Sequence, residues 1–161
     1  CRGRKERMDM IFLSHFENRI DRKGRVSVPA PFRAVLDANK EPLVVTRSLT
    51  ATCLEGQGHS RIAQIIDALD RMDVFSEDIV PLQMMIASAA EVKMDNEGRI
   101  MIPEAFLDHA SITDRVVFAG VGRLFEMWTP DLWQQRMEEQ SRRRPPQLIL
   151  SRNPQPDKEG S

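Results

Sequence analysis

Apolar residues recur at every second position in two short segments of the chain, 26–28 and 100–102. This is the period of a strand with one buried face. Apolar runs at 43–45, 116–118 and 124–128 predict further strands. The pattern therefore predicts a mainly β core with strands in both halves.

Three helices are predicted between and after these strands. Residues 60–72 carry an apolar stripe at the spacing of an amphipathic helix, made by Ile62, Ile65, Ile66 and Leu69. A second helix is expected over 77–90, with Pro81 in its first turn or at a kink. Thr129 and Pro130 suit the N-cap and first position of a last helix, which should end near Arg144.

One segment of the chain occurs twice. Residues 17–32 read ENRIDRKGRVSVPAPF, and 74 residues later 91–106 read EVKMDNEGRIMIPEAF. Both fit E-x-[RK]-[IM]-D-x-x-G-R-[VI]-x-[VI]-P-x-x-F without a gap. A match of this length indicates a duplicated module.

Each copy contains the residues of a tight turn. Asp21 and Asp95 can cap the local backbone, and Gly24 and Gly98 tolerate the left-handed conformation. We therefore expect a β-hairpin with a bulge in each copy. A proline should end each following strand, and an aromatic residue should fold back onto it from a short helical turn: Pro29 with Phe32, and Pro103 with Phe106.

Composition indicates an ordinary globular protein without prosthetic chemistry. The 161 residues are 41% hydrophobic and 29% charged, enough for one domain or two small halves. Cys1 and Cys53 form no motif, and no histidine shares a ligand spacing with them, so we expect no metal, no cofactor and a reducing, cytoplasmic setting.

Export, membrane insertion and catalysis are not indicated. No stretch approaches the ~20 apolar residues that a bilayer requires, and no signal peptide is recognisable. The sequence shows no Ser/His/Asp or Cys/His arrangement and no phosphate-binding glycine loop, so we expect neither an enzyme nor a small-molecule substrate.

Charge is balanced over the chain but not along it. The net charge of −1 means that nucleic acid would require a local basic patch. Such a patch is predicted at the two turns, more strongly at the first, with Arg19, Arg22, Lys23 and Arg25 there and Lys93 and Arg99 at the second. Arginine can grip guanine in the major groove, but from the residues alone these could equally be solvated turn charges.

The paired D-x-x-G-R-[VI]-x-[VI]-P modules, over residues 9 to about 140, resemble the MraZ family of bacterial regulators. The resemblance implies an α+β fold with a mainly β core: a duplicated AbrB-like swapped-hairpin β-barrel with flanking helices. The D-x-x-x-R motif of that family falls on Asp21 with Arg25 and on Asp95 with Arg99. The segment EGQGHS, residues 55–60, departs from the family pattern, where an aromatic, a proline and a tryptophan are expected.

The same resemblance implies a function and a division of the chain. We expect a nucleoid-associated repressor that binds short direct repeats of double-stranded DNA in the promoter of the division and cell-wall gene cluster, as a homo-oligomeric ring. The expected parts are an N-terminal extension, a first repeat with trailing helices, a second repeat with its helix, and a disordered tail, at 1–8, 9–88, 89–144 and 145–161.

Two alternatives remain open at this point. A ring-forming interaction scaffold would need no DNA, and the near-neutral net charge permits it. An antitoxin of the AbrB class usually carries one module and a long tail, whereas this chain has two modules and a short tail.

Overall fold

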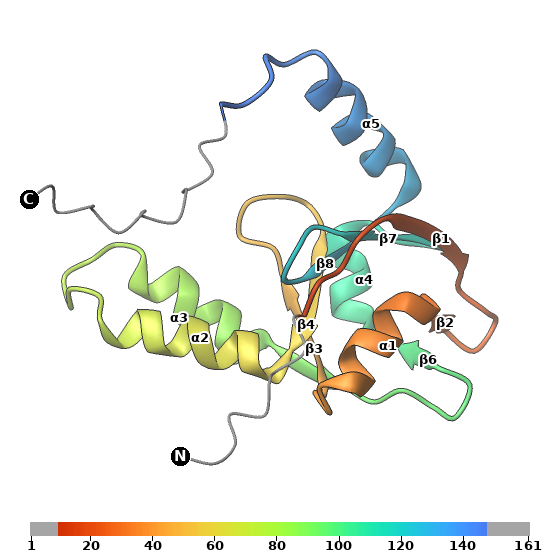
Figure 1. The fold of residues 1–161 in the computed structure, drawn as a ribbon, viewed down its shortest axis with the longest axis horizontal. Coiled ribbons are helices and arrows are strands. Elements are labelled where there is room, and N and C mark those ends of the chain that lie inside the picture. The colour runs from red at the N-terminus through yellow and green to blue at the C-terminus, as the bar shows by residue number, and fades with distance from the viewer. Residues whose placement is uncertain (1–9, 148–161) are drawn as a thin grey trace, which may run out of the picture.

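The computed structural model describes residues 10–147 and shows a mixed α+β fold with antiparallel sheets (Figure 1). The extension expected at 1–8 lies outside the described residues, as does the part of the expected tail from 148 onward.

Six strands form the main sheet and two form a second, small sheet. The main sheet has the order β1-β7-β8-β4-β3-β5, with β1 at His15–Arg19, β7 at Arg115–Gly120, β8 at Phe125–Trp128, β4 at Leu54–Gly58, β3 at Leu43–Arg47 and β5 at Ala90–Val92. The small sheet joins β2 (Arg25–Ser27) to β6 (Arg99–Met101). The strands predicted in both halves are therefore present.

Strands from the two copies of the module pair with each other. β1 pairs with β7, β2 with β6, β3 with β5 and β4 with β8, all antiparallel. The expectation that each turn closes a hairpin is wrong, because the strands on either side of a turn find ladder partners in the other copy. The physical reason is the duplication, because it supplies a second set of strands elsewhere in the chain with which the strands of the first copy can pair.

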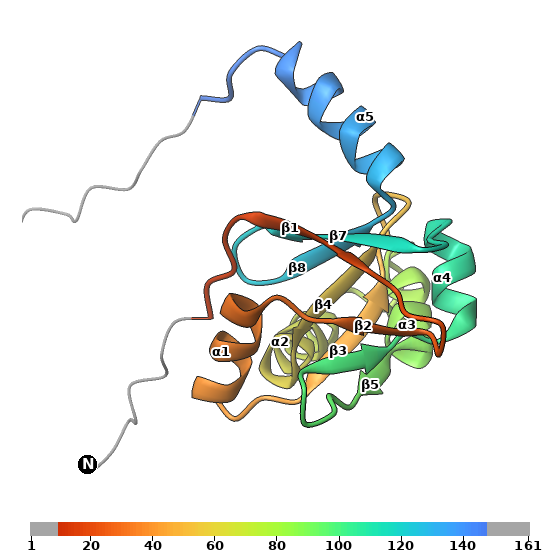
Figure 2. The same cartoon turned by 90° about the vertical axis from the view of Figure 1, so that its right-hand side faces the viewer.

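The core lies between the two sheets and the helices that follow β2 and β6. Val26 and Ile100 face each other across the small sheet and are both 1% exposed. Phe32 and Phe106 are buried, as predicted, but each stands in a full helix rather than a single turn: α1 (Ala30–Ala38) and α4 (Glu104–Ala110). Figure 2 shows α1 and α4 at opposite ends of β2.

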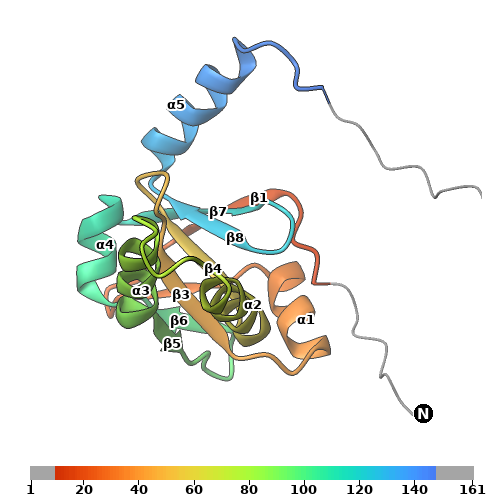
Figure 3. The same cartoon turned by 90° about the vertical axis from the view of Figure 1, so that its left-hand side faces the viewer.

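Two of the remaining helices lie against the outer side of the main sheet, and the third projects from it (Figure 3). α2 (His59–Asp70), α3 (Ile79–Ser88) and α5 (Pro130–Ser141) confirm the three predicted helices, although α5 ends before Arg144. Figure 3 shows α2 and α3 beside each other against β3 and β4, with α5 projecting from the body. α2 and α3 each bury one side chain, Ile62 and Met85, so much of their apolar surface stays exposed.

Candidate nucleic-acid interface

The first turn is organised by the carboxylate of Asp21. Its Oδ1 accepts hydrogen bonds from the backbone N–H groups of Lys23 and Arg25, each at 2.9 Å. The Gly24 N–H donates to the Asp21 carbonyl at 3.0 Å, with a φ of +81° at Gly24. That φ lies in the left-handed region, which glycine adopts without a Cβ clash.

The second turn repeats this geometry. Asp95 Oδ1 accepts from the backbone N–H groups of Glu97 and Arg99, each at 2.9 Å. Gly98 donates to the Asp95 carbonyl at 3.0 Å and has a φ of +76°. The two copies therefore fold their acidic turn residue in the same way.

Each aspartate also holds the arginine that follows its turn. Arg25 Nε donates to Asp21 Oδ2, and Arg99 Nε to Asp95 Oδ2, both at 2.9 Å. Hydrogen bonds from the backbone N–H of the arginine are the largest cause that lowers the pKa of each aspartate, so both carboxylates stay charged. Both bonds to aspartate use Nε, so they do not engage the terminal amino groups of either guanidinium. Bidentate recognition of guanine requires such a pair of donors.

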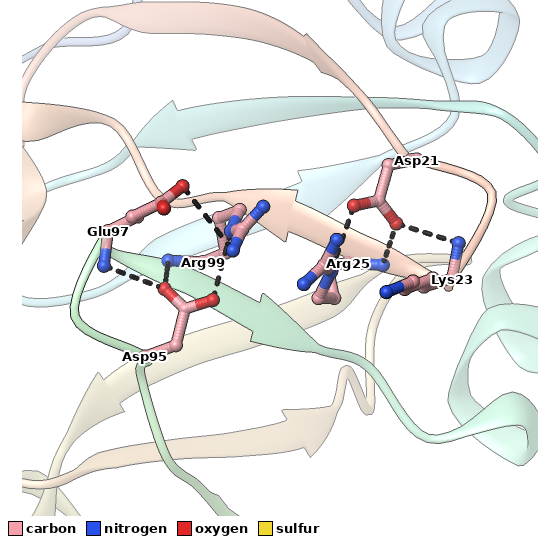
Figure 4. A network of polar contacts seen from close by, with 6 residues as sticks. All are labelled: Asp21, Lys23, Arg25, Asp95, Glu97 and Arg99. Atoms are coloured by element: carbon pink, nitrogen blue, oxygen red, sulfur yellow. Dashed lines mark hydrogen bonds and ion pairs between the residues drawn. The ribbon is translucent and has the colours of Figure 1, made fainter.

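The two arginines lie on one face of the small sheet (Figure 4). In the β2–β6 register, Arg25 stands opposite Met101 and Ser27 opposite Arg99. Because side chains alternate along a strand, these four residues share the outer surface, while the inner residues are buried. Arg25 and Arg99 are diagonal neighbours, and diagonal pairs in an antiparallel ladder have Cα atoms about 7–8 Å apart. We call this surface, made of Arg25, Ser27, Arg99 and Met101, the paired-arginine face.

The two arginines are not equally free. Arg99 Nη2 also lies 3.3 Å from Glu97 Oε2. Within residues 10–147, Arg25 has no acidic partner besides Asp21. The first arginine therefore keeps more of its hydrogen-bonding capacity for a ligand.

The other predicted cations lie in the first turn or two residues before a turn. Arg22 and Lys23 are exposed within the first turn, and Lys93 is exposed just before the second. Arg19 ends β1 directly opposite Arg115, a cation that the sequence did not indicate because its position depends on the pairing of β1 with β7. Ser27 and Met101 were also missed as surface partners, although the strand period alone could have placed each of them beside an arginine.

Two further observations concern other kinds of site. Among residues 10–147, no group of three or more His, Cys, Asp and Glu side chains is arranged to hold a metal ion. No helix in this part of the chain has the length and apolar character needed to span a membrane.

Comparison with known proteins identifies the family. Residues 85–149 match a family model described as "MraZ protein, putative antitoxin-like". A transcriptional regulator MraZ of Gluconobacter oxydans (strain 621H) is 41% identical over 149 residues, which cover 89% of this chain and 90% of that protein. The transcriptional regulator MraZ of Gluconacetobacter diazotrophicus is 40% identical, over 87% of this chain and 91% of its own length, and that of Rickettsia bellii (strain OSU 85-389) is 39% identical, over 74% and 82%. The chain therefore belongs to the MraZ family of transcriptional regulators, which bind DNA to regulate transcription and are not enzymes.

Proposed function

We propose that this chain is a sequence-specific DNA-binding repressor that reads short direct repeats with the paired-arginine face. Its targets on this proposal are the promoter repeats of the division and cell-wall gene cluster, and it acts on the nucleoid in the cytoplasm. The observation that carries the proposal is that the β2–β6 ladder presents Arg25 and Arg99 side by side, each aimed by an aspartate.

The proposed architecture is a swapped-hairpin barrel made by two AbrB-like repeats, 9–88 and 89–144. The exchange of partners among strands of the two copies supports this proposal. A barrel closed in this way would hold the two turns in a fixed relation, which a reading surface requires.

In the proposed complex the cations have two roles. Arg25, and to a smaller extent Arg99, would donate to guanine O6 and N7, since both stand on the outer face of the ladder and their bonds to aspartate use Nε. The exposed cations around the face would neutralise phosphates and fix the register on the duplex. These are Arg19, Arg22, Lys23 and Lys93.

A ring-shaped homo-oligomer is the proposed working form. Its support is the apolar surface left on α2, α3 and the loop between them: Phe75 is 91% exposed, Val74 81%, Val80 60% and Met84 57%. A second copy would cover such a patch. Linked copies would also raise the avidity for adjacent repeats by about 10²-fold or more.

The test compares DNA binding by Arg25→Ala, Arg99→Ala and Arg123→Ala, the last an exposed arginine in the loop between β7 and β8. Each variant is titrated with promoter repeats and with scrambled DNA at several salt concentrations, after light scattering has shown the same oligomer as the parent. Arg25→Ala should cost about 1–3 kcal/mol per site and relax base choice. Arg99→Ala should cost less, and Arg123→Ala nothing.

Three results would count against the proposal. Unchanged promoter affinity for Arg25→Ala would remove the first turn as the main reading element. A clean monomer of 18.4 kDa would remove the ring. An oligomer that shows no salt-sensitive DNA binding would instead favour the interaction scaffold.

A further inference from the structure

The side chain of Arg33 lies across the second turn, although Arg33 belongs to the first copy of the module. Arg33 stands in the first turn of α1. A Cβ placed on Gly98 would collide with Arg33 Nη1 and would lie 2.5 Å from its Cδ and 2.6 Å from its Cζ. Gly98 is buried, whereas a Cβ on Gly24 would have no atom within 4 Å. The two turns therefore differ in what covers them.

The ladder between the two copies causes this contact. The Val28 N–H donates to the Gly98 carbonyl at 3.0 Å, so the chain leaving β2 enters α1 directly beside the second turn. The residue equivalent to Arg33 in the second copy, 74 positions later, is Leu107, which packs against the core. The first copy thus supplies a cation to the second turn, whereas the second copy supplies no cation from the equivalent position to the first turn.

The guanidinium of Arg33 has no partner among residues 10–147. It makes no ion pair there, and its buried Nε has no hydrogen-bond acceptor. The acids of the adjacent turn are already engaged, since Asp95 and Glu97 both pair with Arg99. A partly buried donor without an acceptor is unfavourable unless a ligand completes it.

We propose that Arg33 is a phosphate-contacting residue of the second turn. The inference rests on the proposed DNA-binding function and deepens it. With Arg33 added, the second turn changes from balanced charge to a net positive charge. A phosphate is the expected ligand rather than a base, because Arg33 lies beside the paired-arginine face and is not one of the outward residues of the β2–β6 ladder.

The experiment measures DNA affinity against salt for Arg33→Gln and Arg33→Lys, with Arg123→Ala as the matched loss of an exposed arginine. Each neutralised phosphate contributes about 0.9 to the slope of log affinity against log salt. Arg33→Gln should therefore lose about one unit of slope for each engaged subunit, on promoter and scrambled DNA alike. A fourfold rise in salt should then weaken the parent about 3.5-fold more than the variant for each phosphate that Arg33 neutralises. Arg33→Lys should keep the slope.

Double variants locate the effect. If Arg33 serves the second turn, its loss should be non-additive with Arg99→Ala and additive with Arg25→Ala. Parental slope and affinity in Arg33→Gln, while Arg25→Ala binds poorly, would overturn this inference and leave the proposed function standing. Parental binding in all of Arg33→Gln, Arg25→Ala and Arg99→Ala would overturn the proposed function itself. If Arg33→Gln fails to fold, Arg33→Met keeps an unbranched apolar side chain over Gly98 without the charge and should likewise lower the slope.

Discussion

Gly56→Ala should destabilise the protein by overfilling the centre of its core. Gly56 lies in β4 directly opposite Phe125 of β8, so this contact joins the two copies of the module. The Phe125 side chain is fully buried, and its ring centroid lies 5.0 Å from that of Phe32 and 5.3 Å from that of Phe12. The ring therefore has little room to move.

The size of the effect follows from the contacts that a methyl group would make. A Cβ on Gly56 would lie 3.0 Å from Phe125 Cε1 and closer still to Cε2 and Cζ, whereas carbon atoms in good contact are about 3.5–4.0 Å apart. Overpacking of this kind costs about 1–3 kcal/mol, and the lower entropy of the unfolded alanine chain returns about 0.5–1 kcal/mol. The two ranges combine to a net loss of about 0–2.5 kcal/mol, and we expect the upper part of it, about 1–2.5 kcal/mol, because two ring carbons would lie closer than 3.0 Å. With an m-value of about 2 kcal/mol/M, the urea midpoint should fall by about 0.5–1.2 M.

Urea unfolding at one fixed protein concentration measures this loss, because the proposed oligomer would have a concentration-dependent stability. Phe125→Leu removes ring atoms, so Gly56→Ala should cost much less in that background. Gly24→Ala is the control, since it is strained by its φ of +81° but meets no atom within 4 Å, and its cost should be the same in both backgrounds. Equal destabilisation by Gly56→Ala with and without Phe125→Leu would refute the reasoning.

Two further predictions concern groups on the outer face of the main sheet. Burial raises the pKa of Glu55, and the Glu126 carboxylate opposite Glu55 raises it further. The contribution of Glu55 to stability is therefore present below the unfolded pKa near 4.5 and is lost as pH rises through the folded pKa. Glu55→Gln should therefore raise the free energy of unfolding at pH 7, measured with urea, by up to about 1 kcal/mol. It should also flatten the acid side of the plot of stability against pH; an unchanged plot would contradict this. Burial raises the pKa of the Cys53 thiol to about 12. In a Cys1→Ser background, a thiol reagent at pH 8 should therefore react only after urea is added. Immediate labelling of the folded protein would show instead that the thiol is accessible.

Elements with strong local signals could be predicted from the sequence. The apolar stripe from Ile62 to Leu69 predicted α2, and Thr129 before Pro130 predicted the start of α5, because helix period and capping depend on residues close together in the chain. β4 was missed, since its sequence LEGQG carries two glycines and no strand period. It is a strand because Gly56 makes room for the side chain of Phe125, a residue about 70 positions later in the chain.

The partners of the strands could not be predicted either. Alternation in 26–28 indicates a strand with one buried face but does not say which strand lies beside it, so the expected hairpin was the local choice and was wrong. The motif residues Arg25 and Arg99 were found by comparing the two copies. Their position on one face depends on the register of β2 against β6, which no local pattern encodes.

Placing the two modules in one chain has a consequence for recognition. A dimer of identical modules would present the same arginine, turn and flanking residues twice, and two-fold symmetric proteins match palindromic sites. In this chain the equivalent positions have diverged: Ser27 stands where the second copy has Met101, and Arg33 where it has Leu107. Because both copies contribute to a single β2–β6 ladder, Ser27 and Met101 lie on one surface, and Arg33 lies beside it at the second turn only. Such a surface has unlike halves, so it is suited to a site without internal symmetry, and a ring of copies facing the same way along the duplex is suited to direct repeats of that site.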